Sequence, residues 1–134
     1  MRLFSFEQGG VAKIGAMTGA DSFVDLSAIA PKLPTDMTAL LQLEGGLQAA
    51  RDAASKAAPS ACQSLSGLAS SGMKYLPLVP RPGQVVCMGL NYADHAAEGG
   101  HSRPEYPSFF MRGPNSLVAH GEPIIRPKAS ANLD

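Results

Sequence analysis

The amino-acid sequence predicts an α+β fold: a small β-rich N-terminal domain with one or two helices, followed by the first strands of a second domain. Short alternating segments fill residues 2–26, and leucines at helical spacing follow over residues 40–54. An apolar run at residues 84–88 then precedes a short helical turn. We place the boundary so that an N-terminal accessory domain covers residues 1–72 and a second domain begins at residue 73 and covers 73–134.

The first segments are predicted to form a small antiparallel sheet. Phe4 and Phe6 flank Ser5, and apolar side chains alternate again over residues 11–17, as expected for strands with one buried face. Gly9-Gly10 supplies a turn because glycine takes positive φ without strain, and residues 18–21 supply a second turn.

A helix is predicted to begin after Thr35 or Asp36, either of which can cap it. Its apolar stripe is typical of a core-facing helix and is formed by Leu40, Leu43, Leu47, Ala50 and Ala54. Gly45-Gly46 interrupts the stripe at about 1 kcal/mol per glycine, so two helices are an alternative to one. The small polar residues 58–72 predict a loop or linker.

Beyond the linker, two prolines hold residues 75–80 extended, and the next strand is predicted at residues 84–88. The segment GLNYADHAAE, residues 89–98, is predicted to end this strand and form a short helix that stops at Gly99-Gly100. A further strand is expected at residues 106–112, a turn at 113–115, and short extended pieces at 117–118 and 123–125.

Composition excludes several classes of function. Eleven basic and eleven acidic residues cancel, with a pI near 6.8, and no basic stripe suited to nucleic acid is present. No apolar run approaches the roughly 20 residues that span a bilayer, so no membrane partner is expected. Cys62 and Cys87 are isolated, which favours a reduced cytoplasmic location.

His95 and Glu98 are the strongest candidates for catalytic residues. Three positions apart on a helix, they share one face, and a carboxylate beside an imidazole orients it and raises its basicity. Such a pair can activate a water as a general base. Two alternatives stay open: an incidental pair on a solvated turn, and metal coordination by His95, Glu98 and His101, which would require the helix to continue through the two glycines.

The neighbouring residues are given more modest roles. Asn91 can cap the short helix, and Asp94 is assigned to solvent. Tyr92 either lines a pocket or packs beneath the helix, and we favour packing. Arg112 is a candidate anchor for a substrate carboxylate, with a surface role as the alternative. We interpret His120 and Cys87 as structural.

GLNYADHAAE after a strand, followed by YPSFFMR and a proline-punctuated segment, resembles the fumarylacetoacetate hydrolase family. The resemblance implies a small N-terminal domain, a larger catalytic domain of mixed β-sandwich or β-roll type, and a cytoplasmic homodimer acting in aromatic compound catabolism. Family members cleave diketo acids, decarboxylate oxaloacetate-like acids or isomerise hydroxymuconate-type diacids. A Mg²⁺ or Mn²⁺ ion, held by Glu-x-Glu and a later Asp, binds the substrate's oxygens, and a later lysine assists.

The resemblance implies that His95 is the base and Glu98 its orienting partner. From their chemistry and position, Arg112 and Tyr92 are expected to bind the substrate. No Glu-x-Glu precedes the end of the chain at Asp134, so no ion is expected to bind this chain tightly. We therefore expect a fragment of a metal-dependent carbon–carbon hydrolase for a small diketo acid, inactive alone, which assembles with another copy or a complementing C-terminal segment. Whether the chain itself is an enzyme stays open. The alternatives are an isomerase or decarboxylase of related diacids and a non-catalytic assembly module.

Overall fold

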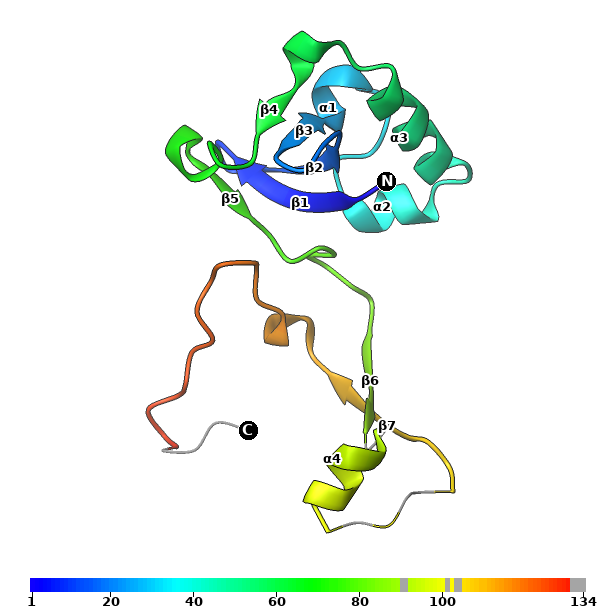
Figure 1. Ribbon diagram of the computed structural model, residues 1–134, viewed down its shortest axis with the longest axis vertical. Helices are drawn as coiled ribbons and strands as arrows, with labels where there is room; N and C mark the ends of the chain where they lie inside the picture. Colours follow the sequence, from blue (N-terminus) through cyan, green and yellow to red (C-terminus); the bar gives the residue numbers. More distant parts are fainter. Residues whose placement is uncertain (90–91, 101, 103–104, 131–134) are drawn as a thin grey trace. The chain divides into compact units, whose positions relative to one another are not determined.

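The computed structural model describes the chain except residues 90–91, 101, 103–104 and 131–134, and it describes only the backbone of Ala69 and His95. The chain packs as two units (Figure 1). The sheet unit comprises Met1–Pro80 and the described residues from Val118 onward, and the hairpin unit comprises Arg81–Leu117.

The sheet unit is built on a five-stranded sheet whose neighbouring strands all run antiparallel, in the order β4-β3-β2-β1-β5. The strands are β1 (Leu3–Gln8), β2 (Val11–Met17), β3 (Ser22–Asp25), β4 (Gln63–Ser64) and β5 (Met73–Tyr75). Gly9 and Gly10 both take positive φ, 59° and 78°, between β1 and β2. The predicted N-terminal sheet is therefore confirmed, together with its first turn.

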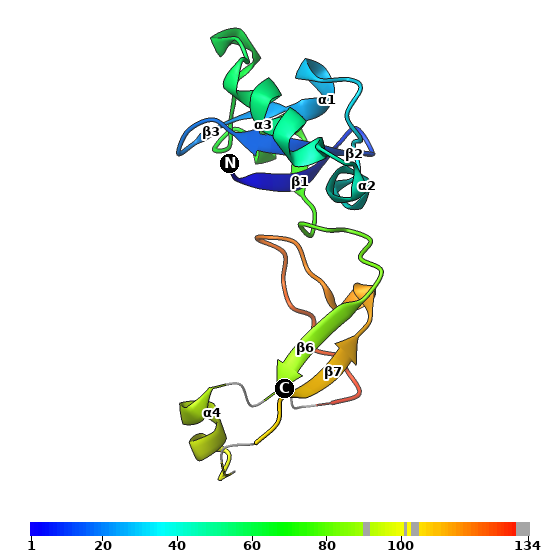
Figure 2. The same ribbon diagram turned by 90° about the vertical axis from the view of Figure 1, so that its right-hand side faces the viewer.

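Three helices pack on one face of this sheet: α1 (Leu26–Ile29), α2 (Met37–Gln42) and α3 (Gly46–Ser55) (Figure 2). The buried side chains between helices and sheet are Ile14, Ala16, Val24, Leu26, Met37, Leu40 and Ala50. Asp36 caps α2, accepting a hydrogen bond from the Ala39 amide at 3.1 Å, as the sequence predicted.

The helical stripe was predicted only in part. Gly45 takes a φ of 69°, so the chain turns between α2 and α3 and the spacing of three and four does not continue across it. Leu40 and Ala50 are buried as expected, whereas Leu43 and Leu47 are nearly half exposed. Two helices replace one, and the break redirects these two leucines to the surface.

Aromatic side chains form a second core on the opposite face. The Phe4 ring lies 5.0 Å from Phe23, 5.6 Å from Phe6 and 5.7 Å from Tyr75, centroid to centroid. Phe4 is the sheet partner of Gly15, and a Cβ at Gly15 would come 2.3 Å from the Phe4 ring, so this position requires glycine for packing.

Residues 58–72 are more ordered than the predicted linker. They contain two short 3₁₀ helices, η1 (Pro59–Ala61) and η2 (Ala69–Ser71), with β4 between them. Asp21 holds this segment to the sheet, because its carboxylate accepts hydrogen bonds from both Ser64 and Ser66. β4 within this segment and β5 directly after it form the two edges of the sheet, β4 beside β3 and β5 beside β1.

The hairpin unit contains β6 (Val85–Gly89) and β7 (Ser108–Arg112), which pair antiparallel, and α4 (Ala93–Glu98) in the connection between them. A third 3₁₀ helix, η3 (Pro114–Ser116), follows β7. Each predicted strand is present with bounds shifted by one or two residues. The extended pieces expected at 117–118 and 123–125 are not strands.

The α+β fold class is confirmed. The division between the two units falls after Pro80, and β5 belongs to the N-terminal sheet although it follows residue 72. The domain limits 1–72 and 73–134 remain a prediction. Among the described residues, no helix combines the length and the apolar character that crossing a bilayer requires.

Candidate active site on the helix between β6 and β7

The candidate catalytic residues lie on α4, which starts soon after β6 ends at Gly89. The first turn closes where the Ala96 amide donates to the Tyr92 carbonyl at 3.1 Å. The helix ends at Glu98, and Gly100 follows with a φ of 69° and donates to the Ala97 carbonyl at 3.0 Å. The two glycines therefore end the helix as predicted.

Residues 95 and 98 occupy positions i and i+3 of this helix, and side chains at that spacing share one face. The Glu98 side chain is exposed, while the side chain of His95 lies outside the described part of the structure. The backbone thus has the register that the pair requires, and their contact remains a prediction. The three-ligand alternative loses its premise, since α4 stops before Gly99; His101 itself lies outside the described residues.

The other side of α4 contacts protein. Ala96, one position after His95, is 2% exposed. Ala96 is therefore the buried position near the centre of this six-residue helix. The remaining described side chains of α4 are exposed.

Tyr92 precedes α4 and is 73% exposed, so the packing beneath the helix that we favoured is wrong. Its hydroxyl and ring are therefore accessible at the N-terminal end of the helix. Asn91, the expected cap, lies outside the described residues. Asp94 is exposed, as expected.

Arg112 is the last residue of β7, where it pairs with Val85 at the start of β6. Its side chain is exposed, and no described carboxylate forms an ion pair with it. The guanidinium is therefore available for an anion, while α4 connects the opposite ends of the two strands, Gly89 and Ser108. Substrate binding by Arg112 and Tyr92 stays a prediction.

The hairpin that carries α4 exposes apolar side chains on both of its faces. Those at least 47% exposed are Val86, Met88, Phe109, Phe110 and Met111. Cys87 is half-buried and, like Cys62, is a free thiol. An isolated two-stranded sheet with such faces is unstable in water, so these faces are surfaces for packing. No predicted site residue lies among them.

The described residues do not fit the metal site that the family resemblance implies. No three His, Cys, Asp or Glu side chains within the described ranges are placed to hold an ion. The hard oxygen donors that Mg²⁺ and Mn²⁺ prefer do not converge near α4 in this part of the chain.

The folded units and the sequence both match known proteins. The family model described as fumarylacetoacetate (FAA) hydrolase C-terminal matches residues 84–134. Over 138 aligned residues, the chain is 33% identical to the mitochondrial oxaloacetate tautomerases Fahd2a of Rattus norvegicus and FAHD2A of Homo sapiens. Each alignment covers 100% of this chain and 42% of the relative.

A solved structure also matches. The crystal structure of a protein from Mycobacterium smegmatis described as HpcE superposes with a TM-score of 0.71 and 29% identity, covering 95% of this chain and 41% of that one. The sequence and the fold of this chain therefore resemble a segment of fumarylacetoacetate hydrolase family proteins. It spans about two fifths of the length of the relatives it matches.

Proposed function

We propose that this chain contributes the general base of an enzyme that interconverts the enol and keto forms of a small 2-oxo dicarboxylic acid. One observation carries the proposal: relatives named oxaloacetate tautomerases align with the whole chain at 33% identity, including the α4 segment. Because the chain spans 42% of those relatives, the activity belongs to the complete protein of which it would be part.

His95 is the proton-handling residue in this proposal. When the enol becomes the keto form, the O–H proton leaves the enol oxygen and a proton is added to the neighbouring carbon. An imidazole with a pKa near 6.5 can accept the first proton near neutral pH. Glu98, one helical turn away, holds the ring nitrogen that does not react, and it stabilises the imidazolium.

Arg112 and Tyr92 supply binding in the same proposal. A planar guanidinium binds a carboxylate with two parallel hydrogen bonds, and Arg112 is exposed and without a described ion-pair partner. The accessible hydroxyl of Tyr92 can donate to a second oxygen of the substrate. Both residues belong to the hairpin unit, as His95 and Glu98 do.

Hydrolysis of a carbon–carbon bond in a diketo acid is the second candidate, favoured by the description of the family model that matches residues 84–134. The same base would then remove a proton from water, and the hydroxide would attack the carbonyl carbon. The carbon–carbon bond next to that carbonyl would break as the adduct collapses to a carboxylic acid, and the other fragment would leave as an enolate that takes up the proton. For both candidate reactions we also propose assistance by Mg²⁺ or Mn²⁺, which would be held by ligands outside the described residues. Assembly with a second copy and a cytoplasmic location are likewise proposals; the tautomerases cited above are named as mitochondrial.

The test is a ketonisation assay. Enol oxaloacetate absorbs more strongly in the ultraviolet than the keto form, so loss of absorbance gives the rate for the protein that carries this chain. We expect His95→Ala to lower kcat by about 10²- to 10⁴-fold, the usual contribution of a general base. Asp94→Asn, a neighbouring exposed carboxylate on α4, is the control and should retain activity.

Release of pyruvate from an acylpyruvate, measured in parallel, separates the two candidates. Ketonisation without pyruvate release supports the tautomerase, and the reverse result supports the hydrolase. Wild-type activity in the His95→Ala variant with either substrate would refute the role of His95.

A further inference from the structure

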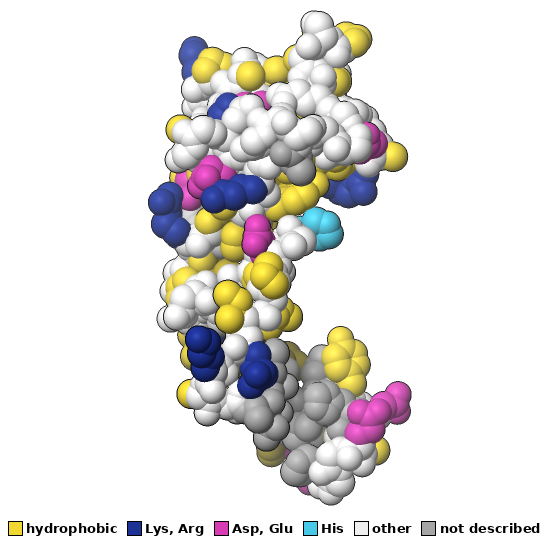
Figure 3. Space-filling view, turned by 90° about the vertical axis from the view of Figure 1, so that its left-hand side faces the viewer, with side chains coloured by type: hydrophobic (Ala, Val, Ile, Leu, Met, Phe, Trp, Pro, Cys, Tyr) yellow, Lys and Arg dark blue, Asp and Glu magenta, His cyan; other side chains and the backbone are white. Residues whose placement is uncertain are grey.

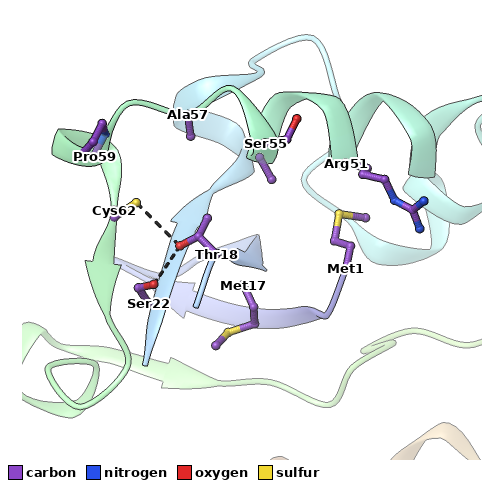
Figure 4. A pocket seen from close by; sticks show the side chains of 10 residues that line it. Met1, Met17, Thr18, Ser22, Arg51, Ser55, Ala57, Pro59 and Cys62 are labelled. Atoms are coloured by element: carbon purple, nitrogen blue, oxygen red, sulfur yellow. Dashed lines mark hydrogen bonds between the residues drawn. The ribbon is translucent and has the colours of Figure 1, made fainter. Parts of the chain in front are cut away.

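A cavity of about 570 Å³ lies in the sheet unit, away from the residues of the proposed active site in sequence and outside the hairpin unit that holds them (Figure 4). This volume falls within the range of roughly 300–1,000 Å³ that is typical of small-molecule sites. α3 and the segment that follows it form one wall, and the end of β2 and the turn after it form the other.

The cavity is lined mainly by apolar side chains. The apolar lining comprises Met1, Met17, Ala54, Ala57 and Pro59, of which the Met17 side chain also packs against the aromatic core. Burial of an aliphatic or aromatic body against this lining is favourable by about 25 cal/mol per Å² of apolar surface removed from water. The lining therefore suits a molecule with an apolar body.

Arg51 is the single charged side chain among the described residues that line the cavity. The neighbouring carboxylate, Asp52, accepts a hydrogen bond from Gln48 at 2.8 Å and makes no ion pair with Arg51. A guanidinium that no described carboxylate neutralises favours a negatively charged ligand, and its planar shape suits a carboxylate.

Hydrogen-bonding groups gather at the other end of the cavity. Figure 4 shows Thr18, Ser22 and Cys62 together at one end, with Arg51 and Met1 at the other. The Thr18 hydroxyl lies 3.0 Å from the Ser22 hydroxyl and 3.7 Å from the Cys62 thiol. Hydroxyls can donate as well as accept hydrogen bonds, so this end of the cavity can accommodate a neutral polar group of a ligand or the apolar end of its body.

We propose that this cavity binds a small monocarboxylate with an apolar body, with the carboxylate on Arg51 and the body against Ala54 and Ala57. The site differs from the proposed active site in its unit, residues and ligand, since the active site would act on a dicarboxylic acid. A bound monocarboxylate would stabilise the sheet unit by mass action, since the unfolded chain has no such cavity.

The experiment is a titration of the 134-residue chain with octanoate, followed by nuclear magnetic resonance of the methyl groups of Ala54 and Ala57. We expect saturable shifts of both methyl signals. Arg51→Gln should weaken octanoate binding by about tenfold, as loss of a charge-assisted hydrogen bond does. Lys56→Gln removes the same charge from an exposed residue just beyond α3 that does not line the cavity, and it should leave the affinity unchanged.

Two further measurements refine the test. The neutral probe 1-octanol should bind wild type and Arg51→Gln equally, because it lacks the carboxylate. Alkylation of Cys62 by iodoacetamide, resolved from Cys87 by peptide mass, should slow at saturating octanoate, whereas alkylation of Cys87 should not.

Three results would overturn the proposal. The first is the absence of a shift at Ala54 and Ala57, and the second is an equal loss of affinity in Arg51→Gln and Lys56→Gln. The third is shifts confined to the apolar hairpin, which would mean non-specific adsorption. None of these measurements depends on enzymatic activity at α4. A negative result for octanoate binding therefore does not refute the proposed function, and a negative activity assay does not refute the proposed cavity ligand.

Discussion

The ion pair between Lys13 and Asp25 should make the sheet unit sensitive to loss of a single carboxylate charge. The Lys13 ammonium donates to Asp25 Oδ2 at 2.8 Å and to Gln8 Oε1 at 3.1 Å. The Asp25 side chain is 5% exposed and that of Lys13 is 23% exposed, so water screens the pair only in part. Asp25 also caps α1, accepting from the Ser27 amide at 2.8 Å and from its hydroxyl at 2.6 Å.

Asp25→Asn removes the charge and keeps the shape. The amide oxygen still accepts from Ser27, so the cap, worth about 1 kcal/mol, is retained. Exposed pairs contribute about 0.2–1 kcal/mol, and breaking a fully buried pair costs about 3–5 kcal/mol. With one partner buried and the other partly solvated, we expect the free energy of unfolding to fall by about 2 kcal/mol.

Urea unfolding followed by circular dichroism measures this change. Glu44→Gln is the matched control, because Glu44 is exposed and has no hydrogen bond or ion pair with the described residues. The free energy of unfolding of this variant should lie within about 0.5 kcal/mol of the wild-type value. In thermal unfolding, Asp25→Asn should lower Tm by about 8 °C, at roughly 4 °C per kcal/mol.

The effect of Asp25 should depend on pH in a defined direction. Burial is the largest influence and raises the pKa of its carboxyl, but hydrogen bonds from Lys13 and Ser27 and the charge of Lys13 together hold the pKa below the ordinary 3.8. Because the folded-state pKa is the lower one, this stabilisation is complete well above pH 3.8 and is lost as pH falls through the folded-state pKa. The difference between wild type and Asp25→Asn should therefore shrink below about pH 4. A constant or growing difference on acidification, or equal midpoints for Asp25→Asn and Glu44→Gln at pH 7, would refute this account.

Two substitutions test packing against a neighbouring control. Gly15→Ala should lower the free energy of unfolding, measured in urea, by about 1–3 kcal/mol. The new Cβ would lie 2.3 Å from the Phe4 ring, which contacts three other aromatic rings and has little room to move. Gly83→Ala, where a Cβ meets nothing within 4 Å, should be neutral, and equal effects would argue against the contact. Leu40→Ala should reduce the free energy of unfolding by about 2–5 kcal/mol, since Leu40 is fully buried. The adjacent Leu41→Ala removes a side chain that is 51% exposed and should have a much smaller effect; the opposite order would contradict the orientation of α2.

The parts of the fold that local chemistry decides could be predicted from the sequence. Asp36 caps α2 and Gly45 interrupts the helices because a side-chain acceptor and a positive φ act within a few residues. β4 could not be predicted, since residues 63–64 become a strand only through pairing with Ser22 and Phe23, some 40 residues earlier. The polar composition around them is equally compatible with a loop.

The candidate active site shows the same division. The spacing of His95 and Glu98, and the end of α4 before the two glycines, follow from the sequence. The exposure of Tyr92 could not be predicted from the sequence, because it depends on what surrounds the short helix and not on the helix itself. The cavity beside α3 had no sequence signal either, since its lining comes from four separated segments whose side chains are individually unremarkable in type.

The placement of β5 has a consequence for synthesis on the ribosome. β1 is among the first segments to emerge, yet its second neighbour, residues 73–75, emerges only after the helices and β4 have been made. Until then, the backbone of β1 from Phe6 to Gln8 presents an open edge, and Met73 is missing from the aromatic core. A nascent chain halted near residue 72 would therefore display a template for strand exchange, and its sheet would close only when the next few residues leave the exit tunnel.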